Sequence, residues 1–136
     1  MPAVTDYARP SDPVGSIVAG AVAEVEQDRT LLDLAEELAA DEIGAVLVRD
    51  PHGVVGLVSE RDLVVVLGGG RDLGEVRVDD VMTTDLVWAR PDATIREVGE
   101  LMRDADVRHI PVGDGRVAQG VVSIRDVLAV LLRPAT

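Results

Sequence analysis

Two strings with the same layout carry the residues best suited to hold a small polar molecule: GLVSERDL (56–63) and GVVSIRDV (120–127). In each, a serine follows an apolar run and an aspartate follows three residues later. The Ser-x-x-Asp spacing of a single copy favours a helix cap, in which serine and acid each accept a backbone N–H. The same geometry also presents a helix N-terminus, with free amides and a positive dipole end, to a phosphate or a ribose. A carboxylate one turn into the helix can accept from two vicinal hydroxyls, so the two roles are compatible.

Two further strings contain polar groups that suit an anionic ligand. The string VRHIPV (107–112) places Arg108 and His109 side by side, and VMTTD (81–85) supplies two adjacent hydroxyls, Thr83 and Thr84. Each string also has a purely structural interpretation. Arg108 can be a solvated charge, His109 a structural histidine, Pro111 an edge position without a strand hydrogen bond, and residues 81–85 a short helical turn.

The sequence lacks the residues of several common catalytic motifs. The chain has no cysteine and two histidines, His52 and His109, so thiol redox chemistry and His/Cys metal spacing are excluded. The glycines 68–70 precede Arg71 where a P-loop needs lysine, and there is no Gly-x-Ser-x-Gly elbow. A hydrolase that uses carboxylates alone stays open, although no residue pattern favours one. We therefore expect a binding protein rather than an enzyme, with no metal.

Composition and charge limit the classes of partner that the chain can bind. The chain has 136 residues, with 13 cationic and 25 acidic side chains and a formal net charge of −12. This balance argues against a general nucleic-acid platform, because such proteins draw affinity from clustered cations. The longest apolar runs, 63–67 and 127–132, are too short for a membrane span, and the N-terminal stretch lacks the apolar core of a signal peptide. We expect a cytoplasmic protein without membrane contact, and a flexible tail over residues 1–13.

An internal duplication organises the chain. Residues 14–67 align without a gap on residues 78–131. The matched identities include Val14/Val78, Asp28/Asp92, Thr30/Thr94, Gly56/Gly120, Ser59/Ser123, Arg61/Arg125 and Asp62/Asp126. The glycine-rich stretch 68–75 has no counterpart and indicates a connection. We therefore divide the chain into a tail (1–13), a first domain (14–68), a linker (69–77), a second domain (78–132) and a short end (133–136).

Each half shows the same order of expected elements. A strand (22–25 or 86–89) precedes an amphipathic helix (30–41 or 94–106), followed by a strand (45–48 or 109–112), a turn, a second strand and an apolar helix that begins at Ser59 or Ser123. The two later strands should pair as a hairpin. A repeat of this size rarely forms a stable core alone. The fold class is therefore α/β (α+β), with two β-α-β-β-α repeats packed sheet to sheet in pseudo-two-fold symmetry and a groove between them.

The order of these motifs resembles the cystathionine-β-synthase (CBS) domain. The second half carries D-x-x-M-T (79–83), the D-x-T-I-x-E helix start (92–97), RHIPV (108–112) and GVVS-x-RDV (120–127), and the first half matches more loosely. Two such domains in tandem resemble a Bateman module, and the likeness covers residues 14–132. It implies a module that senses rather than catalyses. Such pairs bind adenosine-type ligands (AMP, ADP, ATP or S-adenosylmethionine) in clefts between the domains and often assemble as flat homodimers.

The resemblance also implies site residues. Asp62 would hold the ribose, and Arg108, His109 and Arg125 the phosphates. The same cleft would include Ser59, Thr83, Thr84, Val87, Ile110 and Pro111, with aliphatic groups near Val87 and Ile110 against the adenine.

A second cleft would use Ser123 and Asp126 with Ala19, Gly44, Ala45 and Leu47, and with Arg61 as its obvious cation. There Val18-Ala19 replaces Met-Thr, Gly44-Ala45 replaces the basic pair, and Leu47 replaces proline. Because a desolvated phosphate without charge-assisted partners is costly, we expect this cleft to be weakened. The alternative function is a constitutive dimeric interaction module, with an unknown protein partner and without a nucleotide ligand. The apolar last helices and the degraded first half favour that alternative.

Overall fold

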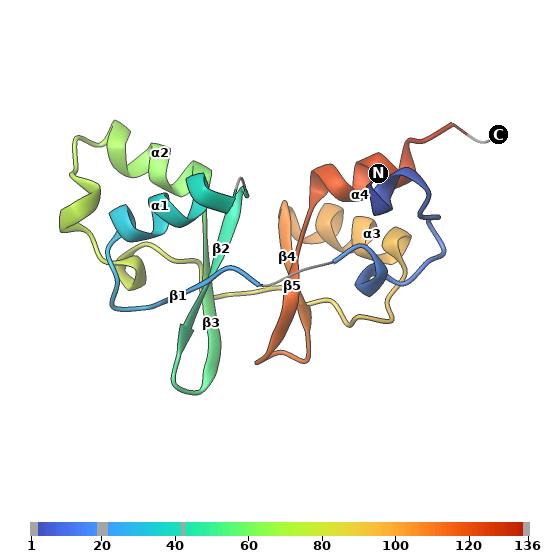
Figure 1. The fold of residues 1–136 in the computed structure, drawn as a ribbon, viewed down its shortest axis with the longest axis horizontal. Coiled ribbons are helices and arrows are strands. Elements are labelled where there is room, and N and C mark those ends of the chain that lie inside the picture. The colour runs from blue at the N-terminus through green and yellow to red at the C-terminus, as the bar shows by residue number, and fades with distance from the viewer. Residues whose placement is uncertain (1–2, 19–21, 42, 135–136) are drawn as a thin grey trace. The chain divides into compact units, whose positions relative to one another are not determined.

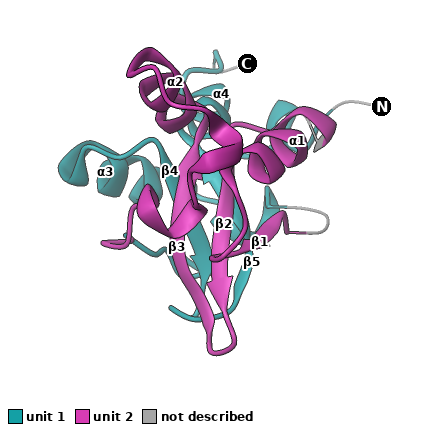
Figure 2. Cartoon of the chain, turned by 90° about the vertical axis from the view of Figure 1, so that its left-hand side faces the viewer, with its two compact units in different colours: residues 1–21, 87–136 teal, residues 22–86 magenta. Residues whose placement is uncertain are grey.

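The computed structural model describes residues 3–18, 22–41 and 43–134, which form two compact units (Figures 1 and 2). Unit 1 contains residues 1–21 and 87–136, and unit 2 contains residues 22–86. The expected mixed α/β chain built from two repeats is confirmed. Each compact unit nevertheless combines segments of both sequence repeats, because residues before 22 belong with the second repeat and residues 69–86 with the first.

Unit 2 is a three-stranded sheet with two helices. Its elements are β1 (Glu24–Glu26), α1 (Leu31–Asp41), β2 (Ala45–Asp50), β3 (Gly53–Ser59), α2 (Glu60–Gly68) and the 3-10 helices η3 (Leu73–Glu75) and η4 (Val78–Asp80). The strand order is β1-β2-β3, with β1 parallel and β3 antiparallel to β2. The predicted hairpin is confirmed, and its register sets Ala45 opposite Ser59.

Both helices of unit 2 pack on the sheet through one apolar core. Alternate residues of a strand face opposite sides, and one face of β2 supplies buried Val46 and Val48. They pack with Leu31 and Leu34 of α1, which the helical spacing predicted as a buried stripe. The cap of α1 is Thr30, whose hydroxyl oxygen accepts from the Asp33 N–H at 3.2 Å.

Unit 1 is a two-stranded hairpin with two helices. Its elements are η1 (Val4–Asp6), η2 (Val14–Ser16), α3 (Ile95–Ala105), β4 (His109–Gly113), β5 (Ala118–Ser123) and α4 (Ile124–Leu131). The strands are antiparallel, with His109 opposite Ser123. Thr94 caps α3 in a reciprocal box with Glu97. The core of this unit joins Ile95, Val98 and Met102 of α3 to apolar residues of β4, β5 and α4.

The strand expected at residues 86–89 is reduced to a single bridge in which Ala89 lies parallel to Val112. In unit 2 the corresponding ladder contains bonds from the Leu47 N–H to the Ala23 carbonyl and from the Gln27 N–H to the Arg49 carbonyl. The equivalent donors in unit 1 would be residues 111 and 91, and both are proline. Because proline has no N–H, only the Ala89 bonds to Pro111 and Gly113 are formed.

The N-terminal segment packs on unit 1, whereas the sequence predicts a loose tail there. Ala8 is 3% exposed, and the Arg133 guanidinium donates to the Thr5 carbonyl at 3.2 Å and also to the Ala8 carbonyl. The Val14 N–H bonds to the Ala93 carbonyl at 2.7 Å. Residues 76–82 make the equivalent contacts with unit 2, where Val78 is fully buried. The first residue of each sequence repeat, Val14 or Val78, therefore belongs to the core formed mainly by the other repeat.

Candidate functional site

The first Ser-x-x-Asp string lies where β3 passes into α2, and it forms a helix cap. The Ser59 hydroxyl oxygen accepts from the Asp62 N–H at 3.4 Å, and Asp62 Oδ2 accepts from the Ser59 N–H at 2.8 Å and from its hydroxyl at 3.1 Å. Asp62 is half-buried, and its Oδ1 accepts no hydrogen bond within the described part of the chain. The capping interpretation therefore holds here, and one carboxylate oxygen stays available to a ligand.

The second string, between β5 and α4, forms only half of that arrangement. The Ser123 hydroxyl oxygen accepts from the Asp126 N–H at 3.2 Å. No reciprocal bond joins the Asp126 carboxylate to the Ser123 N–H, and among the described residues this carboxylate has no hydrogen bond or ion pair. Asp126 is half-buried. Both of its oxygens are thus free to accept.

The basic string lies beside this second helix start. The Ile124 N–H donates to the Arg108 carbonyl at 2.8 Å, and His109 pairs with Ser123 across the hairpin. Arg108 and Arg125 are exposed, and neither guanidinium forms an ion pair within residues 3–18, 22–41 and 43–134. One end of the β4–β5 hairpin therefore carries Arg108, His109, Arg125 and the Asp126 carboxylate, which has no partner among the described residues.

The equivalent end of the β2–β3 hairpin lacks the basic pair. Ala45 lies opposite Ser59, and the Glu60 N–H donates to the Gly44 carbonyl at 3.0 Å. Arg61 is exposed in the first turn of α2, and Leu47 is buried. Ala19, which the sequence assigned to the second cleft, lies outside the described residues.

The Met-Thr string lies along the outer edge of β3 in unit 2. The Thr83 N–H donates to the Leu57 carbonyl at 2.9 Å, and the Leu57 N–H donates to the Thr83 carbonyl at 3.0 Å. The side chain of Met82 covers Gly56, where an added Cβ would lie 2.6 Å from its Sδ. Thr83 and Thr84 are both exposed. Their hydroxyls are thus held in the same unit as Ser59 and Asp62.

Val87 and Ile110, which were expected against the adenine, and Pro111 of the same cleft belong to unit 1. Ile110 is fully buried and, with half-buried Val87 packed against it, belongs to the core of that unit. A side chain without exposed surface can offer a ligand only its backbone. Pro111, on the other face of β4, is also buried, and its carbonyl accepts from the Ala89 N–H at 3.0 Å.

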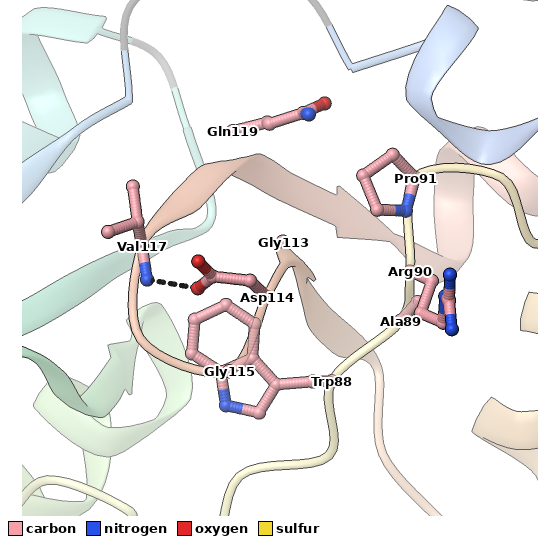
Figure 3. A pocket seen from close by; sticks show the side chains of 9 residues that line it. All are labelled: Trp88, Ala89, Arg90, Pro91, Gly113, Asp114, Gly115, Val117 and Gln119. Carbon is pink, nitrogen blue, oxygen red and sulfur yellow. Dashed lines mark hydrogen bonds between the residues drawn. The ribbon is translucent and has the colours of Figure 1, made fainter.

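A pocket lies at the other end of the β4–β5 hairpin, around its turn (Figure 3). Its volume is about 580 Å³, and it is lined by Trp88, Ala89, Arg90, Pro91, Gly113, Asp114, Gly115, Val117 and Gln119. The sequence reasoning assigned no function to these residues. A comparison of the two repeats could have found them, because Trp88 and Gly113 stand where the first repeat has Glu24 and Arg49.

The described residues contain neither a cluster of metal ligands nor a helix that could span a membrane. No three His, Cys, Asp or Glu side chains among these residues gather in a way that could hold a metal ion. None of the helices described has the length and apolar character that crossing a bilayer requires.

Comparisons with known proteins identify the family. The family model described as CBS domain matches residues 14–69 and 78–133. The CBS domain-containing protein YhcV of Bacillus subtilis (strain 168) is 28% identical over 106 residues, which cover 77% of this chain and 75% of that protein. Some other relatives are longer, and the chain spans 61% and 52% of the length of two of them.

Solved structures show the same fold. The CBS-domain containing protein ATU1752 from Agrobacterium tumefaciens is 34% identical, with a TM-score of 0.78 over 89% of this chain and 94% of that one. The CBS domain protein PAE2072 from Pyrobaculum aerophilum, solved in complex with AMP, is 25% identical, with a TM-score of 0.78 over 88% and 95% of the two chains. Two family matches that together span most of the sequence, on a fold shared with these structures, show that the chain belongs to the CBS domain family as a tandem pair of CBS domains.

Proposed function

We propose that this tandem CBS pair is a regulatory, non-catalytic module that binds an adenosine-containing ligand, with AMP, ADP, ATP and S-adenosylmethionine as candidates. The observation that carries the proposal is that, among the described residues, the guanidinium groups of Arg108 and Arg125 form no ion pair and one carboxylate oxygen of Asp62 accepts no hydrogen bond. Guanidinium groups bind phosphate through charge-assisted bonds, and a carboxylate can accept from ribose hydroxyls. The AMP complex of the Pyrobaculum aerophilum protein supports the same ligand class.

The main site in this proposal draws on residues of both sequence repeats. Asp62 accepts from the ribose hydroxyls, and its free Oδ1 supports that role. Ser59, next to Asp62 in the helix cap, and Thr83 and Thr84, beside β3, supply hydroxyl groups to the same site. Arg108, His109 and Arg125 bind the phosphates, and the surface near Val87 and Ile110 contacts the adenine, with Ile110 contributing its backbone. This grouping rests on the family resemblance.

A second, weaker site would pair Ser123 and Asp126 with Arg61. Its weakness follows from the first repeat, in which Gly44 and Ala45 stand where the second has Arg108 and His109. A phosphate there would have fewer cationic partners, and the net charge of −12 repels it further.

Thermal unfolding with each of the four ligands in turn tests the proposal. A ligand at about 100 times its dissociation constant stabilises the folded state by about 2.7 kcal/mol, which raises the unfolding temperature measurably. No shift with any of the four would contradict the proposal.

Matched variants test the assignment of residues. Asp62→Asn and Asp126→Asn each keep an oxygen that can serve the helix cap while removing the carboxylate charge. We expect Asp62→Asn to abolish the ligand-induced shift and Asp126→Asn to leave most of it. The reverse result would mean that Asp126, and not Asp62, belongs to the main site. Isothermal titration of the same variants measures the loss of affinity directly.

A specific surface feature favours the alternative of a constitutive dimer that docks on another protein. On α2, Val64 and Val65 are 66% and 64% exposed, and Leu128 occupies the equivalent position to Val64 on α4. Exposed apolar side chains on a helix are typical of an interface with a second copy.

Sedimentation of the wild type and of a Val64→Asp/Leu128→Asp double variant tests this alternative. A dimer that the double variant dissociates, with an unchanged circular dichroism spectrum, supports this interface. If the oligomeric state and the unfolding temperature are also unaffected by all four ligands, the constitutive module replaces the sensor. A monomeric wild type at high protein concentration would rule the dimer out.

A further inference from the structure

The pocket at the turn of the β4–β5 hairpin is independent of the proposed adenosine site. None of the residues that line it belongs to the set assigned to the nucleotide, and all of them lie in unit 1. Its volume of about 580 Å³ is in the range that holds a small organic molecule.

The two repeats differ in the residues that lie beside this turn. In unit 2, Glu26 lies opposite Arg49 in the β1–β2 ladder, and their side chains form an ion pair at 3.7 Å. In unit 1 the equivalent positions are Arg90 and Gly113. Glycine contributes no side chain, so the charged Arg49 side chain of the first repeat has no counterpart here, and the Val117 carbonyl and the Trp88 ring lie against Gly113 instead.

The backbone of the hairpin requires glycine at position 113. The register shifts between Val112 and Gly113, and an added Cβ would collide with the Val117 carbonyl oxygen. It would also lie 3.1 Å from Cζ3 of Trp88, so the indole ring packs directly against this glycine. The ring is half-buried and forms one wall of the pocket, as Figure 3 shows. Val117, which is 59% exposed, adds a second apolar wall.

Groups of both charges border these apolar walls. Asp114 Oδ1 accepts from the Val117 N–H at 2.7 Å (Figure 3) and from the Arg116 N–H at 2.9 Å. These backbone hydrogen bonds, that from Val117 first, lower the pKa of Asp114, so its carboxylate is ionised at neutral pH. Arg90 supplies a guanidinium, whose one ion pair among the described residues is an exposed contact with Asp92 at 3.3 Å. Gln119 has no side-chain hydrogen bond within the described residues.

We propose that this pocket binds an α-amino acid with an aromatic side chain. The ligand ring packs on the indole of Trp88, its ammonium group pairs with Asp114, and its carboxylate pairs with Arg90 and the Gln119 amide. A zwitterion matches a pocket that offers one group of each sign beside an apolar wall. A simple organic anion or cation would leave one of these charged side chains facing a like charge.

Three small molecules that share a phenyl ring separate these possibilities. L-Phenylalanine carries both charges, phenylacetate lacks the ammonium group, and phenethylamine lacks the carboxylate. Trp88 is the single tryptophan of the chain, so its emission reports on this pocket alone. We expect L-phenylalanine to change that emission with a dissociation constant in the millimolar range, and both analogues to bind about tenfold more weakly.

Variants assign the two charged contacts. Asp114→Asn keeps an oxygen that accepts from the turn amides, and Arg90→Gln removes the guanidinium without touching the core. Each should weaken L-phenylalanine binding about tenfold, while Arg96→Gln, an exposed change on α3, should leave it unaltered. No response of Trp88 to L-phenylalanine, equal binding of either analogue, or undiminished binding by both pocket variants would overturn the proposal. Because the Trp88 readout needs no nucleotide, failure here would leave the adenosine proposal standing, and the converse also holds.

Discussion

Replacing Gly56 by alanine tests whether the close packing of Met82 on β3 limits this position. The backbone at Gly56 has no positive φ, so alanine fits the local conformation. Its Cβ, however, would lie 2.6 Å from Sδ, 2.9 Å from Cγ and 3.1 Å from Cβ of Met82. Met82 packs against the core of unit 2, and the next residue, Thr83, is bonded to Leu57 in both directions. The side chain therefore has to leave its position, or the strand has to shift.

Two opposing effects set the expected magnitude. Overpacking by one methyl group in a well-packed site costs about 1–3 kcal/mol. The same substitution reduces the freedom of the unfolded chain and contributes about 0.4–1 kcal/mol of stability. Because the Met82 side chain is flexible and only partly buried, we expect the lower half of the overpacking range. The net loss should be about 1 kcal/mol of unfolding free energy.

Urea denaturation measures this loss, and Gly68→Ala is the matched control. Gly68 is the last residue of α2, and a Cβ there would meet nothing within 4 Å. Alanine at that position should therefore be neutral or stabilising by up to about 1 kcal/mol. The two glycine variants should thus differ in sign.

A double-mutant cycle decides whether Met82 is the cause. In a Met82→Ala background the clash is absent, so Gly56→Ala should lose its penalty, with a coupling energy of about 1 kcal/mol or more. If the two substitutions are additive, the steric argument is wrong.

Two further outcomes follow from the contacts of unit 1. Arg133→Ala removes the donors to the Thr5 and Ala8 carbonyls. Amide hydrogen exchange at residues 6–8 should therefore accelerate about tenfold, the ratio that corresponds to about 1.4 kcal/mol. Unchanged exchange would mean that Arg133 does not hold this segment. Because the backbone hydrogen bonds from Val117 and Arg116 hold the folded-state pKa of Asp114 below its ordinary value, its contribution to stability is present above that ordinary value and is lost as the pH falls through the folded pKa. Freshly purified Asp114→Asn should therefore lose less unfolding free energy than the wild type between about pH 5 and about pH 3, and an equal loss would contradict this role of the carboxylate.

Local pattern was sufficient to predict the helices and hairpins. The stripe of Leu31, Leu34 and Leu38 predicts a buried helix face that the core of unit 2 contains. The serine before each last helix predicts the caps that Ser59 and Ser123 form. These features depend on residues close in sequence, so the spacing of side chains carries the information.

The strand expected at residues 86–89 shows where local pattern fails. Its apolar residues suit a strand, but pairing depends on donors at residues 91 and 111, and both are proline. The segment of residues 3–13 was missed for a related reason. Its contacts are with residues far along the chain, such as Arg133, and a short polar segment without periodicity gives no sign of them.

For the candidate site, the sequence identified residue types and the ends of the elements that hold them. Arg108, His109 and Asp126 were expected near strand and helix starts, and they lie there. The difference between the two caps was not predictable, because both strings have the same spacing and only the geometry shows which carboxylate folds back on its serine. The wall of the pocket depends on the packing of the Trp88 ring on Gly113, which no motif records.

Unit 1 is formed by two stretches that are far apart in the sequence, and this affects the order in which the two units can fold during synthesis. During synthesis residues 22–86 emerge complete, whereas residues 3–18 wait for partners that are made last. Cleaving the chain in the glycine-rich stretch 68–75 would separate each unit from one of its own segments. A circular permutant that starts at Val87 and joins the original ends would make both units continuous in sequence and let either one be produced alone.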